Sequence, residues 1–298
     1  MTKNCFYILS GFEKKNFLLL VVLISFFTHP LFSQSPYFEY YKLVRKAKVS
    51  ELDGKHDSAL ICFESAFKIV DFVHEENLKY AIKVAKKLKR NDLQAKYINQ
   101  LQLQKKNTDI SYIDAVNGIF KLDQSVRNSK YEKAKEIYYK CIGDTGCDKN
   151  QKDFLKAKVM MNHWWHIDSI CINELLDLIS KKGFPGERKV WHEASESAYI
   201  VMLHFDVDKE NKKLNPMLLE ALSNGDIKPR DYGLIVDRRM IFAGKDPVYY
   251  IAPFGLDKLT KQQIEEVDKT RIKIGLPTLA DGQKIIQTKN SYIVTYID

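Results

Sequence analysis

The first half of the chain shows apolar residues at the spacing of amphipathic helices, with polar residues between them. Apolar positions that recur every three or four residues form one face of a helix, so this pattern predicts packed helices. Glycine and proline are scarce, 13 and 8 in 298 residues, which excludes long flexible linkers. The predicted helices cover Phe38–Leu52, Asn77–Lys89 and Ser111–Val126.

Three further segments follow these helices and share one template: 54–69, 91–103 and 129–141. Each has a polar turn, a small alanine and then large apolar residues, and the alanines are Ala59, Ala95 and Ala134. A small side chain lets paired helices approach closely. The alanines are 36 and 39 residues apart, and this pattern resembles tetratricopeptide repeats, whose period is about 34 residues.

The resemblance covers residues 38–142 and implies a degenerate helical array with a concave, peptide-binding face. Tyr41, Tyr80 and Tyr112 are candidates for that face, although a tyrosine at helical spacing is more often a core residue. A helical bundle without repeats is the alternative interpretation.

The pattern changes from about residue 163. Helices are predicted over Asn173–Lys182, Val190–Asp206, Pro216–Ser223 and Lys261–Ile274. Between them, Tyr232–Phe242 and Val248–Ile251 are rich in β-branched and aromatic residues around a Gly-Lys-Asp turn, which predicts a β-hairpin. The composition of Ser291–Ile297 predicts another strand.

Residues 168–280 resemble an uncharacterised bacterial domain with no assigned reaction. Its motifs occur here in order, as Gly183-Phe184-Pro185, His204-Phe205-Asp206, Asp237-Arg238, Gly244, and Asp268 through Arg271 before Gly275-Leu276. A Gln-x-Tyr-Gly-Thr-Gln stretch of that domain is replaced by 247–252, which keeps only Tyr249. The resemblance implies a domain boundary and no activity, and the lost residues favour a structural role or an inactive member.

Two sets of polar residues in this half are candidate site residues. The catalytic candidates are His204, Asp206, Asp237 and Arg238, and the binding candidates are Arg239, Tyr249, Asp268 and Arg271. An imidazole with carboxylates and guanidinium groups suits acid–base chemistry or the binding of a phosphate or carboxylate. The competing interpretation is structural, with an Asp–Arg pair tying elements together and His204 bonded at a helix end.

Metal and cofactor motifs are not found. His163 and His166 are spaced for one helix face, but no third ligand lies at a useful distance along the chain, so no metal site and no cofactor are predicted. Trp164 and Trp165 are expected to pack where the two halves meet.

The N-terminus predicts a secretory signal peptide. Lys3, Lys14 and Lys15 precede the 11-residue apolar run Phe17–Phe27, which is shorter than the roughly 20 residues of a membrane span. Cleavage is expected after Ser33; a signal anchor is the alternative. Export to the periplasm or the cell surface follows, with no integral membrane segment after cleavage.

Export bears on the cysteines, since disulfides form in oxidising compartments. Cys141 and Cys147 enclose a short glycine-containing loop and are predicted to form a disulfide. Cys62 falls within a helical pattern and is expected to be a buried thiol.

The formal net charge is +9, from 47 basic and 38 acidic residues, which suits an anionic partner or surface. No patch interleaves aromatic and basic residues, so nucleic acid is not predicted as a partner. The densest basic run, Lys83–Arg90, is typical of the solvated face of an amphipathic helix.

The sequence thus predicts a mainly α protein: a signal peptide (1–33), a tetratricopeptide-like domain (34–160) and a small α+β domain with a β-hairpin (161–298). The expected function is an exported interaction scaffold that binds a protein or peptide through its repeats. The sequence assigns no reaction, and it favours a role without catalysis. The alternative is a C-terminal hydrolase or a module for small anionic ligands, recruited by the repeats.

Overall fold

A computed structural model describes residues 35–144, 146–205, 214–251 and 255–281, and this part of the chain contains helices and no strand. The helices run in the order α2 (Pro36–Leu52), α3 (His56–Phe67), α4 (Glu75–Lys87), α5 (Asn91–Lys106), α6 (Ile110–Gln124), α7 (Ser129–Gly143), α8 (Lys152–Lys182), α9 (Glu187–His204), α10 (Leu214–Ser223), α11 (Pro229–Phe242), the short 3₁₀ helix η1 (Leu256–Lys258) and α12 (Lys261–Lys273).

The predicted β-hairpin is wrong, and with it the α+β class of the second half. Residues 232–242 belong to α11, which begins with Pro229 in its first turn, a favoured place for proline because no backbone N–H is needed there. Tyr232 and Ile235, three residues apart, are buried on one face of this helix. Tertiary packing therefore overrides the strand preference of the β-branched residues. The predicted strand Ser291–Ile297 lies outside the described residues.

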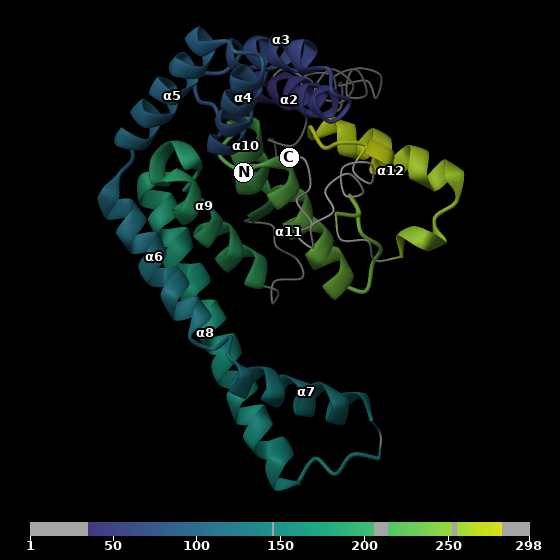
Figure 1. Cartoon of the computed structure of the whole chain (residues 1–298). Helices are drawn as coiled ribbons and strands as arrows, with labels where there is room; N and C mark the ends of the chain where they lie inside the picture. Colours follow the sequence, from purple (N-terminus) through teal and green to yellow (C-terminus); the bar gives the residue numbers. More distant parts are fainter. Residues whose placement is uncertain (1–34, 145, 206–213, 252–254, 282–298) are drawn as a thin grey trace, which may run out of the picture.

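The first helices pack in pairs, α2 with α3 and α4 with α5, an arrangement compatible with a helical repeat array (Figure 1). Ala59, Phe63 and Ala66 of α3 are fully buried, as the repeat template requires. The weakest copy departs from it, because Ala95 is exposed and α5 instead buries Leu93 and Tyr97. Close approach there does not depend on the alanine.

The helices from α2 to α8 form a curved outer layer, and α9, α10 and α11 lie inside the curve (Figure 1). Tyr41 of α2 is buried, and its hydroxyl donates to the Ile227 carbonyl at 3.4 Å. Tyr112 of α6 is also buried, and its hydroxyl donates to the Gly183 carbonyl at 2.7 Å. Two of the tyrosines considered for a peptide groove thus contact the chain's own C-terminal half.

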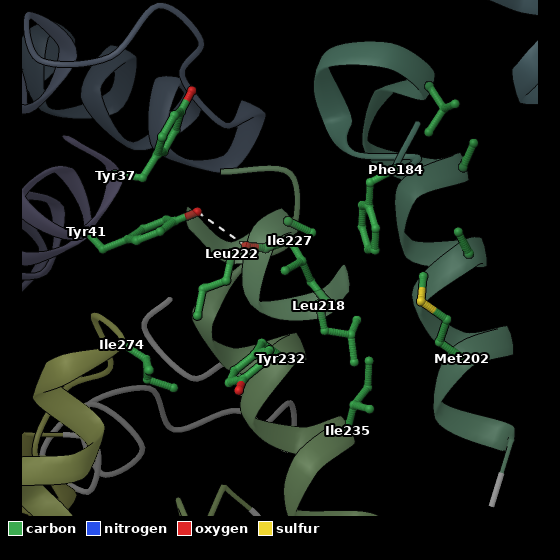
Figure 2. Close-up of a cluster of buried hydrophobic side chains, with 14 of the residues drawn as sticks. Tyr37, Tyr41, Phe184, Met202, Leu218, Leu222, Ile227, Tyr232, Ile235 and Ile274 are labelled. Atoms are coloured by element: carbon green, nitrogen blue, oxygen red, sulfur yellow. Dashed lines mark hydrogen bonds between the residues drawn. The ribbon is translucent and has the colours of Figure 1, made fainter. Parts of the chain in front are cut away.

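Two glycines allow this close packing. A Cβ on Gly225 would lie 2.1 Å from the Tyr37 ring, and one on Gly275 would lie 2.8 Å from Tyr41. Both glycines also have positive φ, which other residues rarely adopt. Figure 2 shows Tyr37 and Tyr41 beside Leu222 and Ile227 in one apolar cluster.

That buried cluster is a single set of residues in mutual contact, with members from Tyr37 in α2 to Leu276 after α12. The expected boundary between residues 160 and 161 falls inside α8, a continuous helix of 31 residues. The two halves of the described chain therefore share a core.

One part projects from this body. It consists of α7, the turn after it and the first half of α8, residues 129–144 and 146–165, here called the α7–α8 hairpin (Figure 1). Tyr138 stacks on Phe154 with ring centres 5.7 Å apart and contacts the edge of Trp165. Cys141 and Cys147 form a disulfide across the turn, with Cα atoms 5.2 Å apart. Trp164 and Trp165 pack against α7 in this hairpin.

Candidate functional site

The densest group of buried charges lies where the outer layer meets the inner helices. Its centre is Glu187, the first residue of α9, which is almost fully buried. One carboxylate oxygen of Glu187 lies 3.0 Å from the Lys228 Nζ and 3.1 Å from the His192 Nδ1. The other accepts the Glu75 backbone N–H at 2.8 Å and lies 3.4 Å from the His74 Nδ1. Glu187 thus connects α9 to α4 and to the start of α11.

A break in α9 makes this geometry possible. Trp191 has φ of +64°, outside the helical region, so α9 is kinked at that residue. Residues five apart on a regular helix point in different directions, but the kink brings His192 to the carboxylate of Glu187. A left-handed conformation is costly for a bulky residue and persists only where surrounding packing enforces it. Trp191 is buried, with the Lys105 ammonium 5.8 Å from its ring centre.

The neighbours of Glu187 set its charge. Burial by itself raises the pKa of this carboxyl, but the nearby His74, the hydrogen bond from His192 and the charge of Lys228 hold that pKa well below its ordinary value. The hydrogen bond to Glu187 in turn raises the pKa of His192 despite its burial. Glu187 is therefore anionic, and Lys228, His192 and His74 surround its carboxylate.

This cluster has almost no free volume. The cavity beside it, lined by His74, Glu187, Tyr199, Asp226 and Asp231 among others, measures about 10 Å³. That volume holds about one water molecule and no substrate. The Tyr41 hydroxyl, 3.0 Å from the His74 Nε2, completes a Tyr–His–Glu sequence, but burial raises the pKa of Tyr41 well above its usual range. The arrangement suits the joining of helices and does not suit catalysis.

Three of the predicted site residues meet elsewhere, around the segment 248–251 between α11 and α12. The carboxylate of Asp237 is fully buried and accepts three backbone N–H groups, from Val248 at 2.8 Å, Tyr249 at 2.7 Å and Ile251 at 2.8 Å. Arg271 approaches from α12 and donates to the carbonyls of Pro277, at 2.7 Å, and Tyr249. Burial raises the pKa of Asp237 while the three N–H donors oppose that rise.

Arg238, Arg239 and Asp268 each have separate contacts, and so does the ring of Tyr249. Arg239 donates to the Asn215 side chain at 3.1 Å, and Asp268 accepts the Leu279 N–H at 2.7 Å. The Arg238 guanidinium lies 5.0 Å from the Phe242 ring centre. Tyr249 packs its ring on Tyr232, and burial raises its pKa. These contacts hold the backbone and the packing of α11 and α12 in place.

His204 belongs to another group. Its Nδ1 lies 3.0 Å from Asp123 of α6, a carboxylate that also pairs with Arg127 at 3.0 Å. Arg127 extends the chain of charges to Asp168 of α8 at 2.7 Å. His204 thus fastens the end of α9 to α6 and α8, while Asp206 lies outside the described residues. The sequence motif His204-Phe205-Asp206 gives no indication of Asp123.

An open hollow of about 320 Å³ lies between the 247–250 segment and α12, lined by Pro247, Tyr250, Leu259, Gln262, Gln263, Glu266 and Val267. Tyr250 has φ of +50°, a backbone conformation that glycine adopts readily and other residues adopt rarely. His204 does not line this hollow or the cavity beside Glu187.

Exposed apolar side chains gather on the α7–α8 hairpin. Val159 is 68% exposed, and Tyr139, Ile142 and Leu155 are each about half exposed. The described residues expose nine large apolar side chains, and this hairpin carries four of them. These four side chains are exposed and so do not pack in the core. A concentration of exposed apolar side chains on one part of a protein is typical of contact surfaces.

Within the described ranges, no cluster of three His, Cys, Asp or Glu side chains is arranged for a metal ion, and no helix is long and apolar enough to cross a membrane. The predicted signal peptide, residues 1–33, lies outside those ranges. Comparison with known protein families, with curated proteins and with solved structures finds no match for this chain.

Proposed function

We propose that this chain is an exported, non-catalytic binding protein whose α7–α8 hairpin engages a protein partner. The observation that carries the proposal is the group of four exposed apolar side chains on the projecting hairpin, Tyr139, Ile142, Leu155 and Val159. Burial of apolar surface against a partner stabilises the complex by roughly 25 cal/mol for each Å² covered, a free energy that is not gained while these side chains stay in water.

The packing of the array supports the same conclusion. A tetratricopeptide-like array holds peptides on its concave side, but here the inner helices α9–α11 occupy that side. The hydroxyl groups of Tyr41 and Tyr112 already donate hydrogen bonds within the chain, to the carbonyls of Ile227 and Gly183. A partner is therefore expected at the hairpin and not in the groove.

The hairpin also has the rigidity that recognition benefits from. Stacked rings join α7 to α8, and the Cys141–Cys147 disulfide closes the turn between them. A surface ordered before binding loses less conformational entropy when the complex forms. The disulfide agrees with the proposed export, since such bonds persist in oxidising compartments.

The hydrolase alternative has weaker support. The carboxylate of Asp237 accepts hydrogen bonds from backbone N–H groups of 248–251, and the guanidinium of Arg271 donates to the backbone carbonyl of Pro277. The Nδ1 of His204 lies 3.0 Å from the carboxylate of Asp123. A reacting substrate needs such atoms free and close together in a cleft.

The test compares Leu155→Asp combined with Val159→Asp against Ile61→Asp, a matched change on α3 at a residue 63% exposed. Native-source protein is purified with its partner, and both the partner retained and the melting temperature are measured. We expect the hairpin variant to lose the partner while melting like wild type, and Ile61→Asp to keep it. Full retention by the hairpin variant would overturn the proposal.

A further inference from the structure

A second surface, distant in sequence from the hairpin, has a uniform chemistry. Every exposed side chain of α4 is a lysine: Lys79, Lys83, Lys86 and Lys87. Their spacing of three and four residues places them on one side of the helix. The opposite side buries Leu78, Ala81, Val84 and Ala85, which fixes the lysines outward. The turn after α4 adds Lys89 and Arg90, both exposed.

Acidic neighbours balance this surface only in part. Glu51 pairs with Lys87 at 3.0 Å and Lys83 at 3.9 Å, and Glu75 pairs with Lys79. Lys86 and Lys89 have no ion pair among the described residues. Over α2–α5, residues 36–106, the chain has 15 basic and 9 acidic residues, a net +6, whereas residues 107–298 have 29 and 28. The charge is thus concentrated on the α2–α5 region and is not dispersed.

The side chains on this face narrow the class of partner. Tyr80 and Ile82 are the large apolar side chains nearest these lysines, and both are half-buried, with the Lys48 ammonium 4.9 Å from the Tyr80 ring centre. The α4 face therefore has no fully exposed anchor of the kind typical of protein interfaces, and no open ring on which a nucleic-acid base could stack. Lysine is a compact, strongly hydrated point charge, whereas arginine is preferred for bidentate recognition of individual phosphates. A stripe of lysines without anchors matches a diffuse negative surface.

We propose that the lysine face of α4 docks on a bilayer of anionic phospholipid. A helix of 13 residues is roughly 20 Å long, so its lysines can meet several headgroups at once without inserting. Attraction of this kind adds up over successive lysines and fades within a Debye length of the surface. The docking is therefore peripheral and salt-sensitive, and it is independent of the protein partner proposed for the α7–α8 hairpin.

The test is co-sedimentation of the mature chain with phosphatidylcholine vesicles that contain or lack phosphatidylglycerol. The main variant combines Lys83→Glu, Lys86→Glu and Lys87→Glu. A second, Lys86→Glu with Lys89→Glu, leaves the pairs of Glu51 intact, so folding is preserved even if the first variant is unstable. The control, Lys152→Glu with Lys156→Glu and Lys158→Glu, changes exposed lysines of α8 by the same charge as the main variant.

We expect wild type and control to bind anionic vesicles at low salt and to release them at high salt. Binding by both α4 variants should fall at least about tenfold. The proposal is overturned if wild type ignores anionic vesicles or if the α4 variants bind like the control. It is equally overturned if duplex DNA or polyglutamate displaces the vesicles by binding the α4 face more tightly.

Discussion

The buried charge cluster around Glu187, here called the junction, holds charged groups in the protein interior, whereas the α7–α8 hairpin holds apolar groups in solvent. At the junction a carboxylate lies in the interior, surrounded by Lys228, His192 and His74. On the hairpin, Leu155 and Val159 extend into solvent without cover. Within the part of the chain that the structure describes, the buried charge has its partners and the exposed apolar groups have no cover. The junction therefore serves folding, and the hairpin is the surface at which we propose that a partner binds.

The largest effect is expected at the junction. Glu187→Ala removes the carboxylate that lies 3.0 Å from the buried Lys228 ammonium, together with the acceptor of the Glu75 N–H. Breaking such a pair costs about 3–5 kcal/mol, so the free energy of unfolding should fall by that amount in urea titration. Glu196→Ala removes a half-exposed partner of His192 and should cost less than about 1 kcal/mol. Equal losses in the two variants would contradict the central place given to Glu187.

The next effect concerns the segment 248–251. Asp237→Ala deprives three buried N–H groups of their acceptor, and a loss of about 3 kcal/mol is expected. Hydrogen exchange should rise first at residues 248, 249 and 251. Arg238→Ala, on the same helix, should be milder because that side chain is half-buried. If Asp237→Ala has the melting temperature of wild type, the structural role is contradicted, and Asp237 becomes a candidate for a binding or catalytic site.

The pH dependence of stability sharpens the same comparison. The pKa of Glu187 is lower in the folded chain than its ordinary value of 4.5, so the unfolded chain binds the proton more readily. The contribution of Glu187 is therefore complete above about pH 4.5 and is lost as pH falls through the folded-state pKa. Urea titrations of wild type and Glu187→Gln should converge as the pH is lowered. Parallel curves would contradict an ionised Glu187.

A smaller and local effect is expected from the disulfide. Cys141→Ser removes a short-loop constraint of about 2 kcal/mol in the chain-entropy model. Because the turn is remote from the junction, faster hydrogen exchange should be confined to the ends of α7 and α8. A non-reduced digest of wild type purified from its native cells should yield the linked Cys141 and Cys147 peptides. Two free thiols would contradict the bond.

Sequence patterns predicted helices well where one amphipathic face dominates, as in α4 and α6. They failed at α11, because β-branched and aromatic residues such as Tyr232 and Ile235 also suit a strand. The first-turn Pro229 was the local signal that favoured a helix. The strand assigned to 248–251 failed for another reason, since its N–H groups bond a carboxylate from α11 and no neighbouring strand.

The buried charge cluster could not be predicted in the same way. Glu187 meets Lys228 and His74 across separations of 41 and 113 residues, and no spacing rule connects them. The kink at Trp191 is likewise imposed by packing and not by a glycine or proline. His204 is the last residue of α9, but its partner Asp123 lies 81 residues earlier in the chain, so the sequence motif could not indicate that contact.

The most direct test is photo-crosslinking of the chain in its native cells. A benzophenone amino acid is placed at Val159 on the hairpin or at Ile61 on α3, two apolar positions of similar exposure. We expect a discrete protein adduct from Val159 and none from Ile61. Adducts of equal yield from both positions, or none from Val159, would contradict a partner-binding hairpin.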